Sequence, residues 1–467
     1  MQLPSAFLSS LQHINGFDKE AFEKIHQNGE QVTSIRMNPS KQLGEGIFQQ
    51  LLSASKQSST IKLEKIPWSS NGLYLSERPS FTIDPLFHAG AYYVQEASSM
   101  FLEQALKQTT DLSQPIKVLD LCAAPGGKST LIQSLISSES LLVSNELIKN
   151  RVTILAENIT KWGAANVVVT NNDPVHLKRL PNFFDAIVVD APCSGSGLFR
   201  KDPNAINEWN EPHVEGCSLR QQRILTDALP SLKEGGTLIY STCSYSTAEN
   251  EAIADWLIET MQLESCQLAI DKNWGIVATE SEKLQAYGYR FYPDKIKGEG
   301  FFIAAFKKTG NGNIDDNKQL SKKYGEKLSK KEIEVVSPFL QNPAAHYFIQ
   351  QGDEAFAIPL QLENDVAIIQ SNLYIKKAGI KLGQIMRTEL IPDHQLALSS
   401  ILNTSLPAVE TDRETALQYL RRQEIKIDTP IKGWTLLTYN QLPLGWMKVL
   451  PNRINNYYPK EWRILNK

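Results

Sequence analysis

Long hydrophobic runs, paired cysteines and an excess of one charge are all missing from this sequence of 467 residues. No stretch approaches the roughly 18 apolar residues that a membrane-spanning helix requires, and the first residues, MQLPSAFLSSLQHIN, contain no basic leader. We therefore expect neither membrane insertion nor secretion. The 48 basic and 51 acidic residues nearly balance, so the overall charge does not single out nucleic acid or membrane as a partner. Any such partner must be recognised by a local surface.

The cysteines are five in number and include no CxxC pair. This pattern is not that of a disulfide framework or of a structural zinc site. None of the seven histidines pairs with a carboxylate at a metal-binding spacing, so we expect no metal. The simplest setting is the reducing cytoplasm, where each thiol needs its own explanation.

Short apolar runs rich in β-branched residues alternate with helical patterns over residues 116–306. This alternation is typical of βαβ units and a parallel sheet. The predicted strands cover residues 116–122, 141–146, 166–173, 185–191, 237–242 and 301–306. The predicted helices cover residues 128–136, 149–162, 219–232 and 249–261. We therefore expect a doubly wound α/β domain over residues 113–308, with its ligand at the carboxyl ends of the strands.

The rest of the chain divides by composition. Residues 1–112 predict an N-terminal α/β extension, and the polar, lysine-rich residues 309–333 predict a linker. Alternating apolar patterns then return, and we divide them into a small intermediate domain, 334–400, and a small β-rich domain, 401–467. From Arg421 onward there are nine basic residues against three acidic ones, interleaved with aromatic residues. This excess suits phosphate contact and base stacking, although core packing would explain the aromatic residues equally well.

A turn that contains proline and glycine follows the first predicted strand, in VLDLCAAPGGKST (118–130). Such a turn lets the backbone approach a ligand and directs free N–H groups at it. The GxGxxG motif of dinucleotide sites is absent, whereas Gly127, Lys128 and Ser129 match the end of a phosphate-binding GxxxxGK[ST] loop that has Cys122 in place of its first glycine. A purely structural turn is a further alternative. We favour an S-adenosylmethionine (SAM) loop, which comprises Cys122, Ala123, Ala124, Pro125, Gly126, Gly127 and Lys128.

Acidic residues stand at the ends of the next three predicted strands: Glu146, Asp173 and Asp190. Glu146 lies where the acid of a dinucleotide site binds the ribose hydroxyls, and Asp173 is placed to meet the adenine edge. One acid at a strand end is common, but three beside one glycine loop converge on a site. The spacing therefore predicts a SAM site that extends to Asp190.

Two cysteines follow neighbouring predicted strands, Cys193 in DAPCSGSG and Cys243 in YSTCS. Adjacent strands lie about 5 Å apart, so both thiols are expected in the crevice of the cofactor loop. A single cysteine after a strand is usually a small buried apolar residue. Two of them, each in a loop of serine, glycine and threonine at the ligand end of the sheet, favour a functional role.

Several motifs together resemble the Sun-type RNA cytosine carbon-5 methyltransferases. They are DLCAAPGGKS, DAPCSGSG, LRQQRIL, LKEGGTLIYSTCSYSTAENE and KGEGFFIAAF, with SIRMNPSK and HAGAYYVQEASSM upstream, and they span roughly residues 1–308. The segment 433–464 is similar to the terminal PUA-like RNA-binding domain of a bacterial member that acts on 16S ribosomal RNA. One departure is Asp294 in YPDKIKGEG, where we would expect a histidine in the substrate loop.

The resemblance implies a Rossmann-like methyltransferase that uses SAM and acts on RNA. The expected target is small-subunit ribosomal RNA or the 30S subunit. The resemblance also implies that Cys243 attacks carbon 6 of cytosine, that Cys193 assists release, and that Asp190 binds the ring nitrogen. The attack is needed because carbon 5 is a poor nucleophile until a thiolate adds to carbon 6. A paired base is out of reach, so the target is either unpaired or flipped out. A catalytically silent RNA-binding or ribosome-assembly protein on the same fold is the alternative.

Other residues carry weaker predictions. Lys201 and Asp202 follow the Cys193 loop, where they would hold RNA or form a solvated charge pair. Arg36 and Asn38 belong to the upstream motif SIRMNPSK, where a structural role beside the methyltransferase domain is equally plausible.

Overall fold

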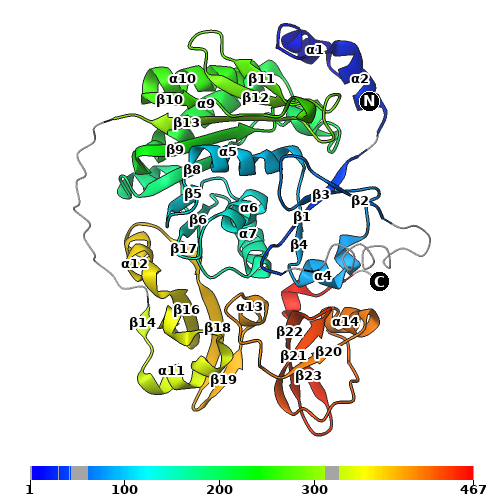
Figure 1. The fold of residues 1–467 in the computed structure, drawn as a ribbon, viewed down its shortest axis with the longest axis vertical. Helices are drawn as coiled ribbons and strands as arrows, with labels where there is room; N and C mark the ends of the chain where they lie inside the picture. The colour runs from blue at the N-terminus through cyan, green and yellow to red at the C-terminus, as the bar shows by residue number, and fades with distance from the viewer. Residues whose placement is uncertain (1–2, 30, 42, 44–60, 311–324, 466–467) are drawn as a thin grey trace.

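The central sheet dominates the computed structural model, which describes residues 3–29, 31–41, 43, 61–310 and 325–465 (Figure 1). Its strand order is β11-β12-β13-β9-β8-β5-β6-β7-β17, with β10 paired to β13. The parallel strands are β5 (Lys117–Asp120), β6 (Leu141–Asn145), β7 (Val167–Thr170), β8 (Phe184–Asp190) and β9 (Leu232–Thr242). The antiparallel strands are β10 (Leu263–Cys266), β11 (Val277–Glu280), β12 (Tyr287–Phe291), β13 (Phe301–Lys308) and β17 (Ile375–Ala378). The predicted doubly wound α/β domain is confirmed.

Helices bury both faces of this sheet, which explains why its parallel strands are almost continuously apolar. One face packs against α5 (Leu102–Thr109), α6 (Gly127–Leu135) and α7 (Lys149–Trp162). The other face packs against α9 (Glu211–Ala228), α10 (Glu251–Met261) and α12 (Glu363–Asn372). Helix α9 begins eight residues before the predicted position, because Asn210 caps it by accepting a hydrogen bond from the backbone N–H of His213. Among the described helices, none combines the length and apolar character needed to span a bilayer.

Strand β17 comes from the intermediate segment and extends the central sheet, which the sequence did not predict. It runs antiparallel to β7, with Ile375 opposite Thr170. Val366 and Ile369 of α12 belong to the same apolar core as the parallel strands. The intermediate segment therefore covers an edge of the central sheet that would otherwise expose unpaired backbone groups.

The rest of the intermediate segment forms a five-stranded sheet in the order β14-β15-β16-β18-β19. Its strands are β14 (Glu326–Lys327), β15 (His346–Gln351), β16 (Glu354–Pro359), β18 (Ile380–Met386) and β19 (Glu389–Pro392), and its other helices are α11 (Lys330–Val336) and α13 (His394–Leu398). Of the linker predicted over 309–333, residues 311–324 lie outside the described residues. Its last part is structured, because Ser329 and Glu332 form a capping box at the start of α11. The segment limits drawn from the sequence remain predictions.

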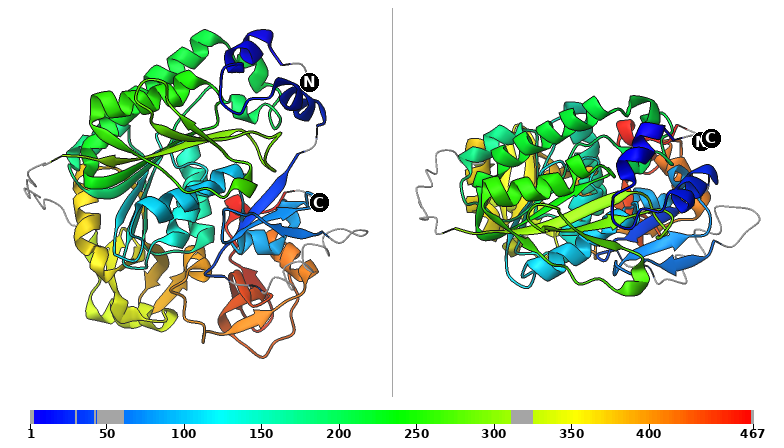
Figure 2. Two further views of the ribbon diagram at one scale, coloured as in Figure 1. Left: turned by 45° about the horizontal axis from the view of Figure 1, so that its top comes forward. Right: turned by 90° about the horizontal axis from the view of Figure 1, so that it is seen from above.

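The N-terminal and C-terminal segments pack on each other (Figures 1 and 2). The N-terminal segment has α1 (Ser5–Leu11), α2 (Lys19–Gln27), α4 (Pro85–His88) and a sheet of β1 (Thr33–Met37), β2 (Leu63–Lys65), β3 (Gly72–Leu75) and β4 (Tyr92–Val94). The C-terminal segment has α14 (Arg413–Leu420) and a sheet of β20 (Ala408–Glu410), β21 (Gly433–Tyr439), β22 (Leu442–Val449) and β23 (Ile454–Asn456). Ile35 and Leu86 share one apolar core with Leu437 and Met447. Helices α1 and α2 instead cover the doubly wound α/β domain, where Phe22 lies edge-on to Tyr245.

Candidate active site

The predicted cofactor loop connects the end of β5 at Asp120 to the start of α6 at Gly127. Gly126 has a φ of 118°, a left-handed conformation that favours glycine. Beneath the loop, the buried Asp120 carboxylate accepts a hydrogen bond of 2.6 Å from the hydroxyl of Ser129, in the first turn of α6. Burial raises the pKa of Asp120 to about 7. This hydrogen bond ties the two ends of the loop together.

A cavity of about 200 Å³ opens beside this loop. One wall consists of residues 122–128 except Gly126, together with Asp190. The other lining residues are 93–96 and Ser99, which belong to strand β4 (Tyr92–Val94) of the N-terminal segment and to the residues after it. The N-terminal segment therefore contributes directly to the predicted cofactor site, a contribution that the sequence did not reveal.

Glu146 follows β6 and is almost fully buried. Its Oε1 accepts a hydrogen bond of 2.9 Å from the backbone N–H of Ile148. Its Oε2 is buried and accepts no hydrogen bond in the described structure, with Arg151 Nη1 at 3.7 Å. A buried acceptor without a donor is costly unless a ligand supplies one. The residues therefore fit a ligand with hydroxyl donors, such as the ribose of SAM.

Asp173 lies after β7, at the same edge of the sheet as Glu146. Its Oδ1 accepts a hydrogen bond of 3.1 Å from the backbone N–H of Val175 and caps a short 3₁₀ helix (Pro174–Arg179). The side chain thus has a structural function in addition to the predicted contact with adenine.

Asp190 ends β8 and pairs with Lys128 of the cofactor loop, with 2.7 Å between Lys128 Nζ and Asp190 Oδ2. The Ser241 hydroxyl donates to the other carboxylate oxygen at 3.0 Å. Burial lowers the pKa of Lys128, but the negative charge of Asp190, with smaller effects of Asp120 and Cys243, outweighs burial and leaves that pKa above its ordinary value. Lys128 therefore remains a cation at the end of the cofactor loop, where it interacts with Asp190 and Cys243.

Cys193 and Cys243 follow the neighbouring parallel strands β8 and β9, and their sulfur atoms lie 2.9 Å apart. Both are free thiols. The hydrogen bond with Cys243, together with burial and the nearby Glu249 carboxylate, raises the pKa of the Cys193 thiol well above its usual range. The structure thus brings together the two thiols that the sequence singled out, and it makes their surroundings unequal.

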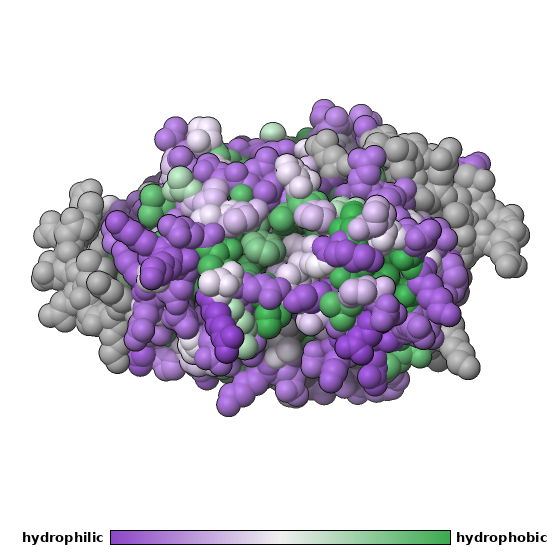
Figure 3. All heavy atoms as spheres, turned by 90° about the horizontal axis from the view of Figure 1, so that it is seen from below, coloured by the Kyte–Doolittle hydropathy of each residue, from purple (hydrophilic) through white to green (hydrophobic). Residues whose placement is uncertain are grey.

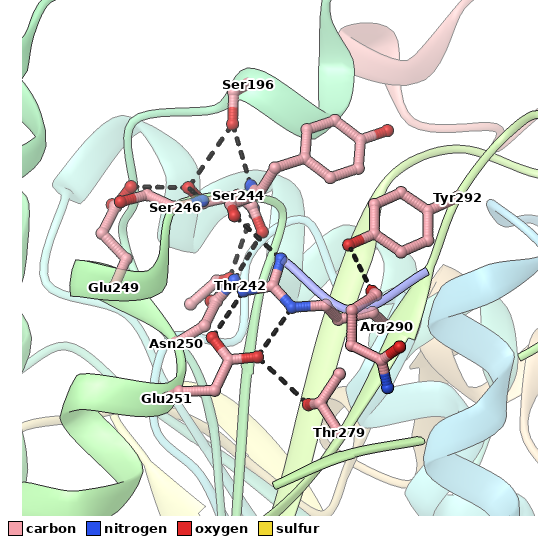
Figure 4. Close-up of polar contacts among 12 residues, drawn as sticks. Ser196, Thr242, Ser244, Ser246, Glu249, Asn250, Glu251, Thr279, Arg290 and Tyr292 are labelled. Atoms are coloured by element: carbon pink, nitrogen blue, oxygen red, sulfur yellow. Dashed lines mark hydrogen bonds and ion pairs between the residues drawn. The ribbon is translucent and has the colours of Figure 1, made fainter. Parts of the chain in front are cut away.

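Two residues of the motif STAENE hold the cysteine loops, and we did not single them out from the sequence (Figure 4). Glu249 is fully buried and accepts hydrogen bonds from Ser194 and Ser244, the residues that follow the two cysteines. Asn250 accepts a hydrogen bond of 2.6 Å from the Thr242 hydroxyl and donates one of 2.8 Å to the carbonyl of Ser244. In the sequence, the signal that could have revealed these two residues was an acid and an amide in a motif that also supplies the start of a helix.

Arg36 links the N-terminal sheet to the helix after the cofactor loop. It is 1% exposed, and its guanidinium donates to Thr130 Oγ1 at 2.6 Å and to Gln95 Oε1 at 2.9 Å. Asn38 donates to two backbone carbonyls, those of Gly90 and Trp162. Both side chains are thus engaged in structural contacts between segments.

The remaining predicted residues lie farther from the thiols or at the surface. Lys201 and Asp202 are exposed, and Asp202 Oδ1 accepts a hydrogen bond of 3.1 Å from the backbone N–H of Asn204. Asp294, where a histidine was expected, pairs with Lys295 at 3.3 Å. Burial raises the pKa of Cys122 well above its usual range. Within the described ranges, no three His, Cys, Asp or Glu side chains are grouped so as to hold a metal ion.

A groove of about 800 Å³ crosses the C-terminal segment. It is lined by residues 424–429, Lys432 and residues 449–454, and it contains the exposed cations Lys426, Lys432 and Arg453. Hydrophilic side chains predominate on the lower face of the molecule and interrupt its apolar patches (Figure 3). The exposed acids Glu424 and Asp428 also line the groove, so its cations exceed its anions by one.

Comparison with known families gives matches along the chain. Residues 107–307 match the family model described as 16S rRNA methyltransferase RsmB/F. Residues 3–97 match the N-terminal domain of 16S rRNA methyltransferase RsmF, and residues 406–464 match the methyltransferase RsmF PUA domain.

Curated relatives align over most of the chain. Ribosomal RNA small subunit methyltransferase F of Shewanella piezotolerans is 30% identical over 428 residues, which cover 85% of each chain. The protein of that name from Aliivibrio fischeri strain MJ11 is 30% identical over 475 residues, which cover 98% of this chain and 97% of its own.

Solved structures share the fold. A methyltransferase homolog protein from Pyrococcus horikoshii is 27% identical with a TM-score of 0.52, and the match covers 66% of this chain and all of that chain. NSun6 from the same organism, solved with SFG, has a TM-score of 0.53 at 21% identity and covers 66% of this chain and 99% of its own.

Proposed function

Because this chain belongs to the 16S rRNA methyltransferase RsmB/F family, and is a SAM-dependent RNA cytosine-5 methyltransferase, we propose that it acts through a covalent adduct between Cys243 and the target cytosine. The observation that carries this proposal is the 2.9 Å separation of the Cys193 and Cys243 sulfur atoms beside the cofactor loop. Two thiols in contact suit a reaction that must both form and break a bond to carbon 6. The proposed substrate is RNA of the small ribosomal subunit, which would place the enzyme in the cytoplasm.

The proposed reaction conserves atoms and charge. The Cys243 thiolate adds to carbon 6, and the electrons of the C5=C6 bond make carbon 5 nucleophilic. When bound, SAM supplies an electrophilic methyl group on a sulfonium, and it leaves as S-adenosylhomocysteine. Loss of the proton from carbon 5 then restores the C5=C6 bond and expels the Cys243 thiolate, so that one proton is released per methyl group transferred.

Charges around the two thiols support unequal roles for them. The Lys128 ammonium lies close enough to Cys243 to interact with it electrostatically, and a nearby cation stabilises a thiolate. The charge of Glu249 acts on Cys193 and favours its neutral thiol. We therefore assign attack to Cys243 and assistance in release to Cys193. We assign to Asp190, at the end of β8, the binding of the ring nitrogen as that nitrogen gains a proton in the adduct.

The cofactor assignments rest on the fit of the residues to SAM. Glu146, with its unpartnered Oε2, is proposed to bind the ribose hydroxyls, and Asp173 the adenine edge. Residues 122–128 are proposed to contact the methionine part along the cavity wall. None of these steps calls on a metal ion, so we propose that the reaction proceeds with SAM alone.

Single-turnover methyl transfer from labelled SAM to small-subunit ribosomal RNA tests the proposal. Label on carbon 5 of cytosine, lost in Cys243→Ala, is the expected result. RNA that binds but stays unlabelled would instead favour the catalytically silent RNA-binding protein. Bisulfite sequencing of ribosomal RNA from a deletion strain would then identify the cytosine.

A further inference from the structure

Glu249 accepts hydrogen bonds from both cysteine loops, and its bond to Ser244 is drawn in Figure 4. Its Oε1 accepts a hydrogen bond of 2.8 Å from the backbone N–H of Ser194 and one of 3.2 Å from the side-chain amide of Gln221. Its Oε2 accepts hydrogen bonds from the hydroxyls of Ser194, at 2.5 Å, and Ser244, at 2.6 Å. One buried carboxylate thus holds the residue after each cysteine.

The hydrogen-bond directions around Ser244 require a strong acceptor at position 249. The Ser244 hydroxyl oxygen accepts from the backbone N–H of Ser246 at 3.1 Å, so its hydrogen is free to be donated to Glu249. The backbone N–H of Ser194 and the amide of Gln221 also act only as donors. A carboxylate satisfies all of these donors, whereas an amide side chain would present a donor of its own to some of them.

The partners of the Glu249 carboxylate are hydrogen-bond donors without charge. Among the described residues, no lysine, arginine or histidine nitrogen forms an ion pair with Glu249, although the other acid of the same motif, Glu251, is paired with Arg290. Four hydrogen-bond donors stabilise the Glu249 carboxylate instead. Its field therefore acts on the nearest ionisable groups, which include the Cys193 thiol.

We propose that Glu249 is a positioning residue with two effects: it fixes the distance between the two cysteine loops, and its charge keeps Cys193 a neutral thiol while Cys243 is the nucleophile. The first effect follows from its bonds to both loops. The second follows from the arrangement of charges, because Glu249 is bonded to the residue directly after Cys193 and its charge acts on the Cys193 thiol, whereas the charge of Lys128 acts on Cys243. A neutral Cys193 retains a proton beside the sulfur that must leave carbon 6.

The test of the charge effect measures thiol reactivity and needs neither RNA nor SAM. Besides Glu249, the titratable groups that face Cys193 are Cys243 and Tyr240. The rate of iodoacetamide alkylation of each cysteine is followed across pH by peptide mass spectrometry, in the full-length protein and in Glu249→Gln. The midpoint of each profile is the pH at which the alkylation rate reaches half of its maximum. We expect the midpoint for Cys193 to fall by about one pH unit in Glu249→Gln, so that Cys193 reacts about tenfold faster below that midpoint. An unchanged midpoint in a folded variant would overturn the charge effect.

Glu103→Gln is the matched control. Glu103 is also buried and also accepts hydrogen bonds from two serines, Ser69 and Ser70. It differs in that it lies on α5 and forms an ion pair of 2.6 Å with Lys107. We expect this variant to leave the Cys193 midpoint in place. A shift as large as that of Glu249→Gln would mean that any buried acid has this effect, and would overturn the proposal.

Ser244→Ala tests the positioning effect separately. It removes the tie between Glu249 and the Cys243 loop but leaves the carboxylate beside Cys193. We expect single-turnover methyl transfer to slow by about tenfold to a hundredfold while SAM affinity and the Cys193 midpoint are unchanged. Full turnover in both Ser244→Ala and Glu249→Gln would overturn the positioning effect. The measurement of methyl transfer rests on the proposed function, and an active Cys243→Ala variant would show that the proposed function itself is wrong. The measurement of alkylation does not depend on the proposed function.

Discussion

The sulfur atoms of Cys193 and Cys243 lie 2.9 Å apart, although 50 positions separate the two residues in the chain. Two thiolates at this distance would repel each other strongly, so the two thiols do not readily ionise together. In the proposed mechanism, Lys128 lies near the attacking Cys243 and Glu249 favours the neutral thiol of Cys193. The proposed division of labour therefore predicts opposite behaviour of the two alanine variants.

Cys193→Ala is expected to attack and methylate cytosine but to fail in release. A protein–RNA adduct should accumulate with SAM and survive denaturing electrophoresis. Cys243→Ala should form no adduct and transfer no methyl group, because it lacks the nucleophile. The double variant should also form no adduct. A gel shift with purified RNA measures all three, and an adduct in Cys243→Ala but not in Cys193→Ala would reverse the assigned roles.

Glu146→Ala is expected to weaken SAM binding. The variant loses a charged acceptor whose Oε2 has no hydrogen-bond donor in the described structure, so the loss should be roughly 1.5–3 kcal/mol. Isothermal titration calorimetry with SAM measures the affinity. Glu139→Ala, an exposed acid just before β6, is the control and should bind SAM as the parent does. Equal affinities in the two variants would remove Glu146 from the cofactor site.

The periodicity of the sequence predicted the parallel sheet because its strands are buried on both faces and its helices are amphipathic. Helix α7 was predicted with both of its ends. Strands β11 and β12 were missed because they are short and mix polar with apolar residues. Strand β17 was missed for another reason: its sequence, IKKA, has a place in the central sheet only through tertiary contact with β7.

The candidate site, like the fold, could be predicted from the sequence only where tertiary contacts were not needed. The spacing of glycines, acids and cysteines along successive strands was enough to propose the cofactor loop and both thiols, because strand ends meet at one edge of a parallel sheet. The position of Tyr93 and Gln95 in the cavity wall depends on how the N-terminal sheet docks, which Arg36 helps to fix. Glu249 was also missed, since an acid near a helix start is ordinarily a cap.

Neutralising the C-terminal groove should weaken RNA binding without changing the chemistry. Replacing Lys426, Lys432 and Arg453 by glutamine removes three exposed cations. If each contacts a phosphate, the slope of log affinity against log salt should become shallower by about 2 to 3. SAM affinity should not change.

A salt titration of RNA binding measures this slope. The control replaces Lys330, Lys331 and Arg387 by glutamine, three exposed cations of the intermediate segment. Identical slopes in the groove variant and the parent protein would show that the groove does not bind RNA.

The last prediction concerns acid stability and His394, at the start of α13. Its ring is buried between Tyr458 and Trp462, and neither ring nitrogen has a hydrogen-bond partner in the described structure. Burial, with smaller effects of Lys161 and other cations, lowers the pKa of His394 from 6.5 to about 3. The unfolded chain therefore binds a proton more readily than the folded chain between these two pH values, so this residue's contribution to stability is present above about pH 6.5 and is lost as the pH falls.

His394→Leu should remove this acid sensitivity. Leucine is similar in size and has no polar atom to bury, so stability near pH 8 should change by less than about 1.5 kcal/mol. Below pH 6.5 the free energy of unfolding of the variant should rise relative to that of the parent by up to about 1.4 kcal/mol per pH unit, because a shift of one pKa unit corresponds to that free energy. Urea unfolding at several pH values between 4.5 and 8 measures the difference. His13→Gln, at an exposed position, is the control and should follow the parent at every pH. A constant difference between His394→Leu and the parent across this range would mean that His394 does not titrate on unfolding, because only a group whose proton affinity changes can alter the slope.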